Sequence, residues 1–187
     1  MHTSARKTYL LIDGENLDAT LGSSILSGRP SPEQRPRWER LLEWSQEHWE
    51  QEVIGLFFLN ATNGSLPMSF VQALMAIGFQ PIPLSGSIHE KVVDIGISRT
   101  LQALLPRDGD VILGSHDGDF AEDLENLVDG RRIAVVGFRE FISSSLSKLA
   151  DDGVEVVDLE YEVGAFNVHL PRLRIIPLEE FDPIPFL

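Results

Sequence analysis

Blocks of apolar and polar residues alternate along the chain from Thr8 to Asp158. Short apolar runs without polar alternation predict strands that are buried on both faces, as in a parallel sheet covered by helices. Longer segments with apolar residues three and four positions apart predict amphipathic helices. The pattern predicts strands at 8–12, 53–59, 79–84, 111–113, 132–137 and 154–158, and helices at 17–21, 38–49, 67–77, 91–105, 120–128 and 146–150.

The regular alternation of strands and helices is typical of βαβ units, whose connections are right-handed and whose sheets are mainly parallel. We therefore expect an α/β, Rossmann-like three-layer fold, with a mainly parallel sheet of about five to six strands and helices on both faces. Residues 22–36 are rich in Ser, Pro and Gly, which predicts a long loop.

Residues 1–159 are expected to form a single domain, followed by a tail at 160–187 that mixes Pro, Phe and Leu with acidic residues and has no period. The tail either packs on the domain or binds a protein partner, and packing is the commoner outcome.

Acidic residues lie where predicted strands end and where a predicted helix begins. Asp13 follows the first strand, Asp94 lies early in the helix at 91–105, and Asp117 and Asp119 follow the apolar strand Val111–Leu113. In open α/β sheets, ligands bind at the carboxyl edge of the strands. Carboxylates close together repel unless hydrogen-bond donors or a cation compensate their charge. An oxygen-rich cluster of this kind suits Mg²⁺ or Mn²⁺.

Three of these residues, Asp94, Asp117 and Asp119, and the nearby Asn16 also have a purely structural interpretation. Asp117 and Gly118 form a common turn dipeptide, and Asp119 has the spacing of a capping box with Glu122. Asn16 can cap a short helix that Gly22 would close, and Asp94 can cap its own helix or lie in the first turn. Convergence of separate sequence regions on one edge favours the cation.

Composition narrows the function classes. The chain has 187 residues, no cysteine and a formal net charge of −14, which excludes disulfides and thiolate sites and argues against broad electrostatic adhesion to nucleic acid. A local basic surface remains possible, and the densest basic group is formed by Arg29, Arg35, Arg37 and Arg40. No apolar run is long enough for a membrane span or a signal peptide, so we expect a cytoplasmic protein without a membrane partner.

Three short motifs, in this order and spacing, resemble the NYN domain, a branch of the PIN-like nuclease superfamily. They are Asp13-Gly14-Glu15-Asn16, Lys91-Val92-Val93-Asp94 and Ser115-His116-Asp117-Gly118-Asp119-Phe120. The resemblance extends over roughly Thr8 to Val157. It implies a Rossmann-like fold and metal-dependent ribonuclease activity, and single-stranded RNA is the expected substrate.

The resemblance also implies roles for individual residues. Asp13, Asp117 and Asp94 would hold a Mg²⁺ or Mn²⁺ ion that activates a water, and Asp119 would hold a second cation or a metal-bound water. Asn16 and Ser115 match the amide and hydroxyl of the family pattern, whereas His116 stands where a small residue is often found. Lys91 contacts a substrate phosphate or is a solvated surface lysine, and Arg29, Arg35, Arg37 and Arg40 are candidate RNA-binding residues.

Two other classes of function fit the same residues. The fold could serve as a non-catalytic RNA- or protein-binding regulatory module, or as a phosphohydrolase acting on small phosphate esters through the same metal. A homodimer is compatible with either class.

Overall fold

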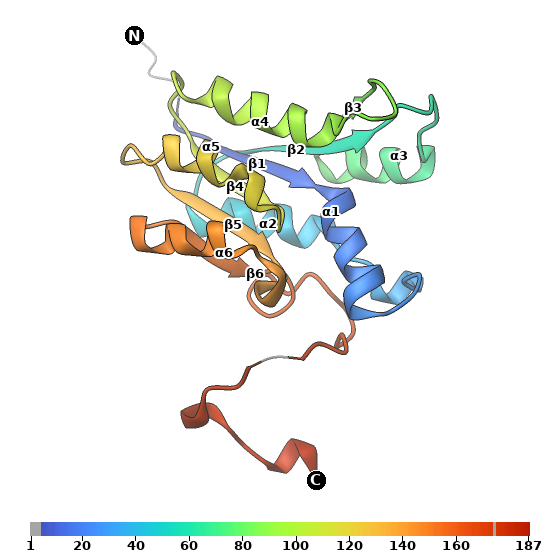
Figure 1. Ribbon diagram of the computed structural model, residues 1–187, viewed down its shortest axis with the longest axis vertical. Coiled ribbons are helices and arrows are strands. Elements are labelled where there is room, and N and C mark those ends of the chain that lie inside the picture. Colours follow the sequence, from blue (N-terminus) through green and yellow to red (C-terminus); the bar gives the residue numbers. More distant parts are fainter. Residues whose placement is uncertain (1–4, 174) are drawn as a thin grey trace.

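Six parallel strands form the centre of the molecule in the computed structural model, which describes residues 5–173 and 175–187 (Figure 1). Their order in the sheet is β3-β2-β1-β4-β5-β6, and each neighbouring pair is parallel. The predicted α/β class with a mainly parallel sheet is confirmed. The strands are β1 (Thr8–Asp13), β2 (Val53–Asn60), β3 (Gln80–Leu84), β4 (Asp110–Gly114), β5 (Ile133–Gly137) and β6 (Glu155–Asp158).

Helices cover both faces of the sheet, as the unalternating apolar strands require. Leu10 and Ile12 of β1 pack into one core cluster, and Leu11 between them packs into the other. The first cluster includes α1 (Gly14–Ala19), its continuation as a π-helix (Thr20–Ile25), α2 (Trp38–His48) and α3 (Met68–Ile77). The second includes α4 (Val92–Leu104), α5 (Ala121–Asn126) and α6 (Ser144–Ser147).

Short 3₁₀ turns complete the described chain at Pro32–Gln34, Gly118–Phe120, Arg139–Phe141, Lys148–Asp152, Leu178–Glu180 and Ile184–Phe186. None of the helices in the described ranges is long and apolar enough to cross a membrane.

The strand order reverses direction between β1 and β4. The chain first builds outward from β1 through β2 to β3, then returns to the other side of β1 with β4 and continues outward to β6. In the register, Ile12 of β1 pairs with Gly114 of β4, so Asp13 and Ser115 follow side by side at the carboxyl edge. The point where strand order reverses is where open α/β sheets leave a crevice for ligands.

The first helix differs from the prediction. It was expected at 17–21, with Asn16 as cap and Gly22 as end, but it begins at Gly14 and continues to Ile25. Leu17, Leu21 and Ile25 are buried four residues apart, so the apolar face continues past Gly22 and packing overrides the glycine. The loop predicted at 22–36 therefore begins only after Ile25, and it contains the 3₁₀ turn at Pro32–Gln34.

The chain after β6 has two parts. Ala165 and Leu170 are buried against the domain, and the Arg172 side chain is 1% exposed. Beyond Arg172, apolar side chains such as Leu173 and Leu187 are almost fully exposed, and this end of the chain extends away from the sheet (Figure 1). The division predicted between 159 and 160 stays a prediction, and residues 1–4 and 174 of the predicted segments lie outside the described residues.

Candidate functional site

A polar crevice of about 340 Å³ opens at the carboxyl edge beside the end of β1. Three of the four predicted acidic residues, Asp13, Asp94 and Asp117, line it together, and Asn16 and Lys91 lie among them. The fourth, Asp119, is exposed and lies outside the lining, although its charge acts on Asp94. The complete lining is Asp13, Glu15, Asn16, Asn60, Glu90, Lys91, Val92, Val93, Asp94 and Asp117.

Asp13 ends β1 and is 2% exposed. Its Oδ2 atom accepts a hydrogen bond from the Ser115 hydroxyl at 2.9 Å. Burial raises the pKa of Asp13 to about 6; the Ser115 hydrogen bond opposes this shift, and the negative charge of Asp94 adds to it. The next residue is held to glycine, because a Cβ at Gly14 would lie 2.4 Å from the Phe57 ring.

Ser115 connects Asp13 with the other acidic strand end. Its Oγ accepts the backbone N–H of Asp117 at 3.1 Å while it donates to Asp13. On the facing helix, the Oδ1 atom of Asn16 accepts the backbone N–H of His116 at 2.8 Å. Asn16 thus lies inside α1 and binds the loop after β4, so the predicted capping role of Asn16 is wrong.

Asp117 caps the turn that follows β4. Its Oδ1 atom accepts the backbone N–H of Asp119 at 2.9 Å, the two-residue spacing that aspartate commonly makes. The predicted capping box of Asp119 with Glu122 is therefore wrong, because the cap lies two residues earlier. The other carboxylate oxygen of Asp117, Oδ2, makes no hydrogen bond to a residue of the described chain.

Asp94 lies in the first turn of α4 and is half-buried, so it borders the crevice rather than the core. Burial raises its pKa, the charge of Asp117 raises it further, and the ammonium of Lys91 opposes the shift. Lys91 itself is exposed just before the helix. Lys91 is the single cationic side chain among the residues that line the crevice.

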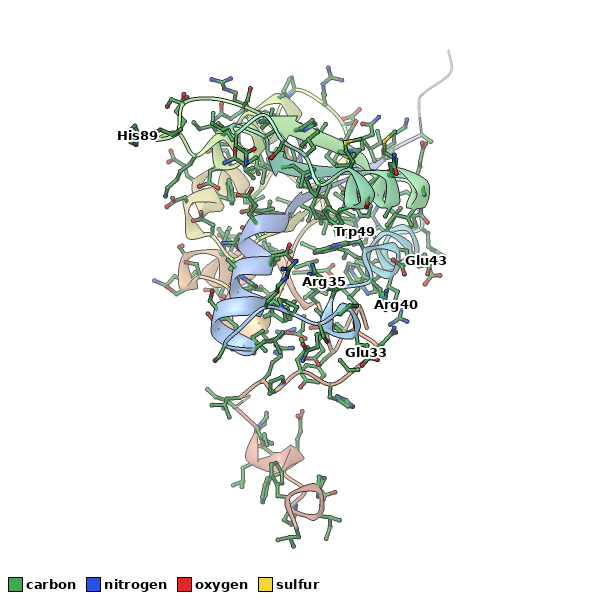
Figure 2. All side chains as sticks on the ribbon, turned by 90° about the vertical axis from the view of Figure 1, so that its right-hand side faces the viewer. Glu33, Arg35, Arg40, Glu43, Trp49 and His89 are labelled. Carbon is green, nitrogen blue, oxygen red and sulfur yellow. The ribbon has the colours of Figure 1, made fainter. Side chains whose placement is uncertain are left out.

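The predicted arginine group lies apart from the crevice lining. Arg29 and Arg35 are exposed, and the charge of Arg35 acts on Asp18 of α1. Arg40 donates to the Gly164 carbonyl at 3.2 Å and to Asn167 Oδ1 at 2.5 Å, so it holds the chain that follows β6. Figure 2 shows Arg35 and Arg40 on one side of α1, with His89, which precedes α4, on the other.

Arg37 also contacts the chain after β6. Its backbone N–H donates to the Ala165 carbonyl at 2.7 Å. The Nε atom of its side chain is buried without a hydrogen-bond partner.

The chemistry of the crevice residues fits a hard divalent cation. The polar groups beside Lys91 are carboxylates and amides, and oxygen atoms are the ligands that Mg²⁺ and Mn²⁺ prefer. Among the described residues, no three histidines or carboxylates are arranged as a complete metal site. Mg²⁺ keeps several waters and uses as few as one or two carboxylates, so Asp13 and Asp117 with Asp94 nearby fit such an ion.

Several residues at the crevice were not identified from the sequence. Asn60 ends β2, and its position after an apolar strand is the signal that marked Asp13. Glu90 directly precedes the motif residue Lys91, and Glu15 lies within the first motif although no role was predicted for it. Thr20, which is not among the lining residues, was also overlooked, because its contact with the ring of His116 joins positions far apart in the sequence.

Comparison with known proteins identifies the family of this chain. A search of curated protein sequences gives no significant match. The fold is similar to the crystal structure of VPA0982, a protein of unknown function from Vibrio parahaemolyticus, with a TM-score of 0.66 and 20% identity over 87% of this chain and 98% of that one. Residues 7–158 match the sequence pattern of the NYN domain, which includes all three acidic strand-end and helix-start regions. The chain therefore belongs to the NYN domain family.

Proposed function

We propose that this protein is a metal-dependent ribonuclease that hydrolyses phosphodiester bonds of single-stranded RNA at the crevice between β1 and β4. Membership of the NYN family supports a nuclease. The observation that carries the proposal is that Asp13, Asp94 and Asp117 share one crevice whose lining holds a single cationic side chain, Lys91, and that burial and the neighbouring carboxylates raise the pKa of Asp13 and of Asp94. The repulsion between these carboxylates is relieved when a cation binds among them.

The residues of the crevice divide the work between binding and positioning. Asp13, Asp94 and Asp117 would hold Mg²⁺ or Mn²⁺, which supplies a water of lowered pKa and a polarised phosphate when it is bound. Ser115 orients the Asp13 carboxylate through its hydroxyl, and Asn16 fixes the loop that carries Asp117. Lys91 would contact a substrate phosphate, which its position in the crevice lining supports. Asp119, exposed at the rim, would act on a second cation or its water.

The test is cleavage of single-stranded RNA with Mg²⁺ or Mn²⁺ and with chelator, for the wild type and Asp117→Asn. We expect cleavage only with metal, and we expect the variant to be inactive yet folded, because asparagine keeps the oxygen that caps Asp119. Activity of the variant equal to wild type, or activity undiminished in chelator, would rule out the mechanism.

Two alternatives are separated by the same assay. Binding of RNA without cleavage in Mn²⁺ would favour a non-catalytic module of the same fold. Cleavage of a small chromogenic phosphate ester, with RNA left intact, would favour a phosphohydrolase. The crevice is open and small, about 340 Å³, which gives either substrate access to the carboxylates.

RNA affinity needs cations that the crevice does not supply beyond Lys91. Arg29 and Arg35 are exposed, which supports their proposed RNA-binding role, although the charge of Arg35 also acts on Asp18. Arg37 and Arg40 remain proposed members of this surface, although their contacts with Ala165, Gly164 and Asn167 leave less of each side chain available.

A protein partner, if the chain has one, would meet the tail beyond Arg172. Its apolar side chains Leu173, Ile175 and Leu178 are 84% exposed or more, which is costly in water and supports a role in binding. A homodimer and a cytoplasmic location stay predictions. Sedimentation of the purified chain tests the first.

A further inference from the structure

His116 lies between the acidic residues and uses every one of its polar groups. Its backbone N–H donates to Asn16 Oδ1 at 2.8 Å, and its carbonyl accepts the Ser143 N–H at 3.0 Å. Its Nδ1 lies 3.0 Å from the Thr20 hydroxyl, and its Nε2 accepts the Phe138 N–H at 2.8 Å. One residue thus joins α1, the end of β4, the end of β5 and the segment before α6.

These contacts determine which ring nitrogen of His116 carries the proton. The backbone N–H of Phe138 can only donate, so Nε2 must be the unprotonated acceptor. The proton of the neutral ring then lies on Nδ1 and is donated to the oxygen of Thr20. The Thr20 hydroxyl in turn donates to the Asn16 carbonyl at 3.2 Å, which closes a chain of hydrogen bonds along one face of α1.

The imidazole ring of His116 lies against Gly137, where the absence of a side chain leaves space for it. A Cβ on Gly137 would lie 2.6 Å from Cδ2 and 2.7 Å from Nε2 of His116, closer than atoms can approach. The ring is held on both nitrogens and cannot swing away without losing a hydrogen bond. The imidazole and the glycine therefore form a complementary pair at the ends of β4 and β5.

We infer that His116 is a positioning residue, whose ring clamps α1 to the carboxyl ends of β4 and β5. Asn16 lies in α1, and Thr20, four residues later, begins the π-helix that continues it, so the backbone and the ring of His116 bind the same face of this helix. The clamp fixes Asn16 against the loop and fixes Asp117 beside Ser115. Its consequence for a cation rests on the proposed function, whereas the clamp itself does not.

The first test compares Thr20→Val, which keeps the shape and removes the hydroxyl, with Thr20→Ser, which keeps the hydroxyl. Imidazole ¹⁵N shifts of the wild type should report a neutral ring protonated at Nδ1; protonation at Nε2 would overturn the inference. In Thr20→Val the amides of His116 and Asp117 should exchange roughly 2- to 10-fold faster, relative to the β5 amide of Val135. Thr20→Ser should retain wild-type exchange.

Equal acceleration of all amides, Val135 included, would mean that only global stability changed, and the positioning role would be refuted. This readout needs neither metal nor RNA, so it stands even if the ribonuclease proposal fails. If the wild type binds Mn²⁺, Thr20→Val should weaken binding about tenfold and Thr20→Ser should not. Unchanged Mn²⁺ affinity in Thr20→Val would show that the clamp does not position the cation-binding carboxylates.

The second test uses the pairing of the ring with Gly137. Gly137→Ala should lower the Tm by several degrees, roughly 2–12 °C, because the added methyl overlaps the ring. His116→Ser removes the ring, so the double variant should lose less than the sum of the two single losses. Additive losses would show that the two positions are not in contact and would overturn the clamp.

Discussion

Two buried aspartates lie on neighbouring strands at opposite ends of the same sheet, and their surroundings differ in one respect. Asp13 at the carboxyl end of β1 is 2% exposed, and Asp110 at the start of β4 is 1% exposed. Asp110 receives hydrogen bonds from the Arg6 and Arg132 guanidinium groups and from Gln51. Asp13 receives no bond from a cationic side chain in the described chain.

The difference in partners reverses the direction of the pKa shift. Burial raises the pKa of both carboxyls, but the hydrogen bonds from Arg6, Arg132 and Gln51 bring that of Asp110 down to about 2. At Asp13 the effect of burial is opposed by hydrogen bonds from the Ser115 hydroxyl and the Asn16 backbone, and its pKa rises to about 6. A buried carboxylate that serves the fold is compensated from within the chain, whereas one left uncompensated is a candidate for an external cation.

The largest expected effect comes from removing the charge of Asp110. Asp110→Asn removes the charge that strengthens the hydrogen bonds from two guanidinium groups, Arg6 and Arg132. Hydrogen bonds to charged groups contribute about 1.5–3 kcal/mol each, so we expect the variant to reduce the free energy of unfolding by about 3–5 kcal/mol. Asp13→Asn is the matched control in the same sheet, and it should be as stable as wild type or more so at pH 7 without metal. Urea denaturation with chelator measures both. Equal losses of unfolding free energy in the two variants would mean that Asp13 and Asp110 do not differ in how the chain compensates their charge.

A smaller effect is expected in the pH dependence of stability. Because the folded pKa of Asp13 is raised, the folded chain binds more protons than the unfolded chain between about pH 4 and 6, so this group stabilises less as pH rises. Relative to Asp13→Asn, the wild type should therefore lose on the order of 2–3 kcal/mol between pH 4 and 7. Asp110 acts oppositely, because its contribution is lost only as the pH falls from about 4 to 2.

The difference between the variants is the quantity to measure, because His116 titrates in an overlapping range. Burial lowers the pKa of His116 to about 4, so this ring stabilises the fold increasingly as pH rises through that range. Subtracting the curve of Asp13→Asn from that of wild type cancels the histidine. A difference independent of pH would contradict the raised pKa of Asp13.

Much of the fold follows from local sequence patterns. Unalternating runs such as Val111–Leu113 correctly predicted strands buried on both faces, and the alternation of elements predicted a parallel α/β sheet. The first helix was predicted less well, because the continuing buried face at Leu21 and Ile25 outweighed Gly22. Burial depends on tertiary neighbours, which a local glycine signal does not contain.

The search for acidic residues at strand ends and helix starts identified three carboxylates that line one crevice. The sequence did not predict which side chains form hydrogen bonds or ion pairs with the acidic residues. Asp158 also ends a strand at the carboxyl edge, yet Arg172 neutralises it from fourteen positions away in the chain. Burial opposes ionisation of Asp158, and the hydrogen bonds from Arg172 and from the backbone lower its pKa. Which strand-end acid is compensated is decided by long-range contacts, so sequence spacing alone cannot separate Asp158 from Asp13.

The smallest effect is expected at Asp119, where the sequence had allowed either a cap or a cation site. Because Asp117 makes the capping bond, Asp119→Ala should change the stability of the metal-free protein by less than about 0.5 kcal/mol, whereas Asp117→Ala should cost roughly 0.5–2 kcal/mol. Thermal melts with chelator compare the two variants. An equal loss of stability in both variants would mean that Asp119 contributes to the cap as much as Asp117 does.

Excess Mn²⁺ then separates the remaining roles of Asp119. Cation at a hundredfold over its Kd stabilises the native wild type by roughly 2.7 kcal/mol, and a variant with weaker binding gains less at the same concentration. Asp119→Asn removes a negative charge from an exposed side chain and leaves the fold unchanged. A smaller stabilisation by Mn²⁺ in this variant would therefore show that the Asp119 carboxylate attracts the cation. Its charge does reach Asp94, which supports a small reduction. Equal gains in wild type and Asp119→Asn would exclude Asp119 from the cation site and leave it to Asp13, Asp94 and Asp117.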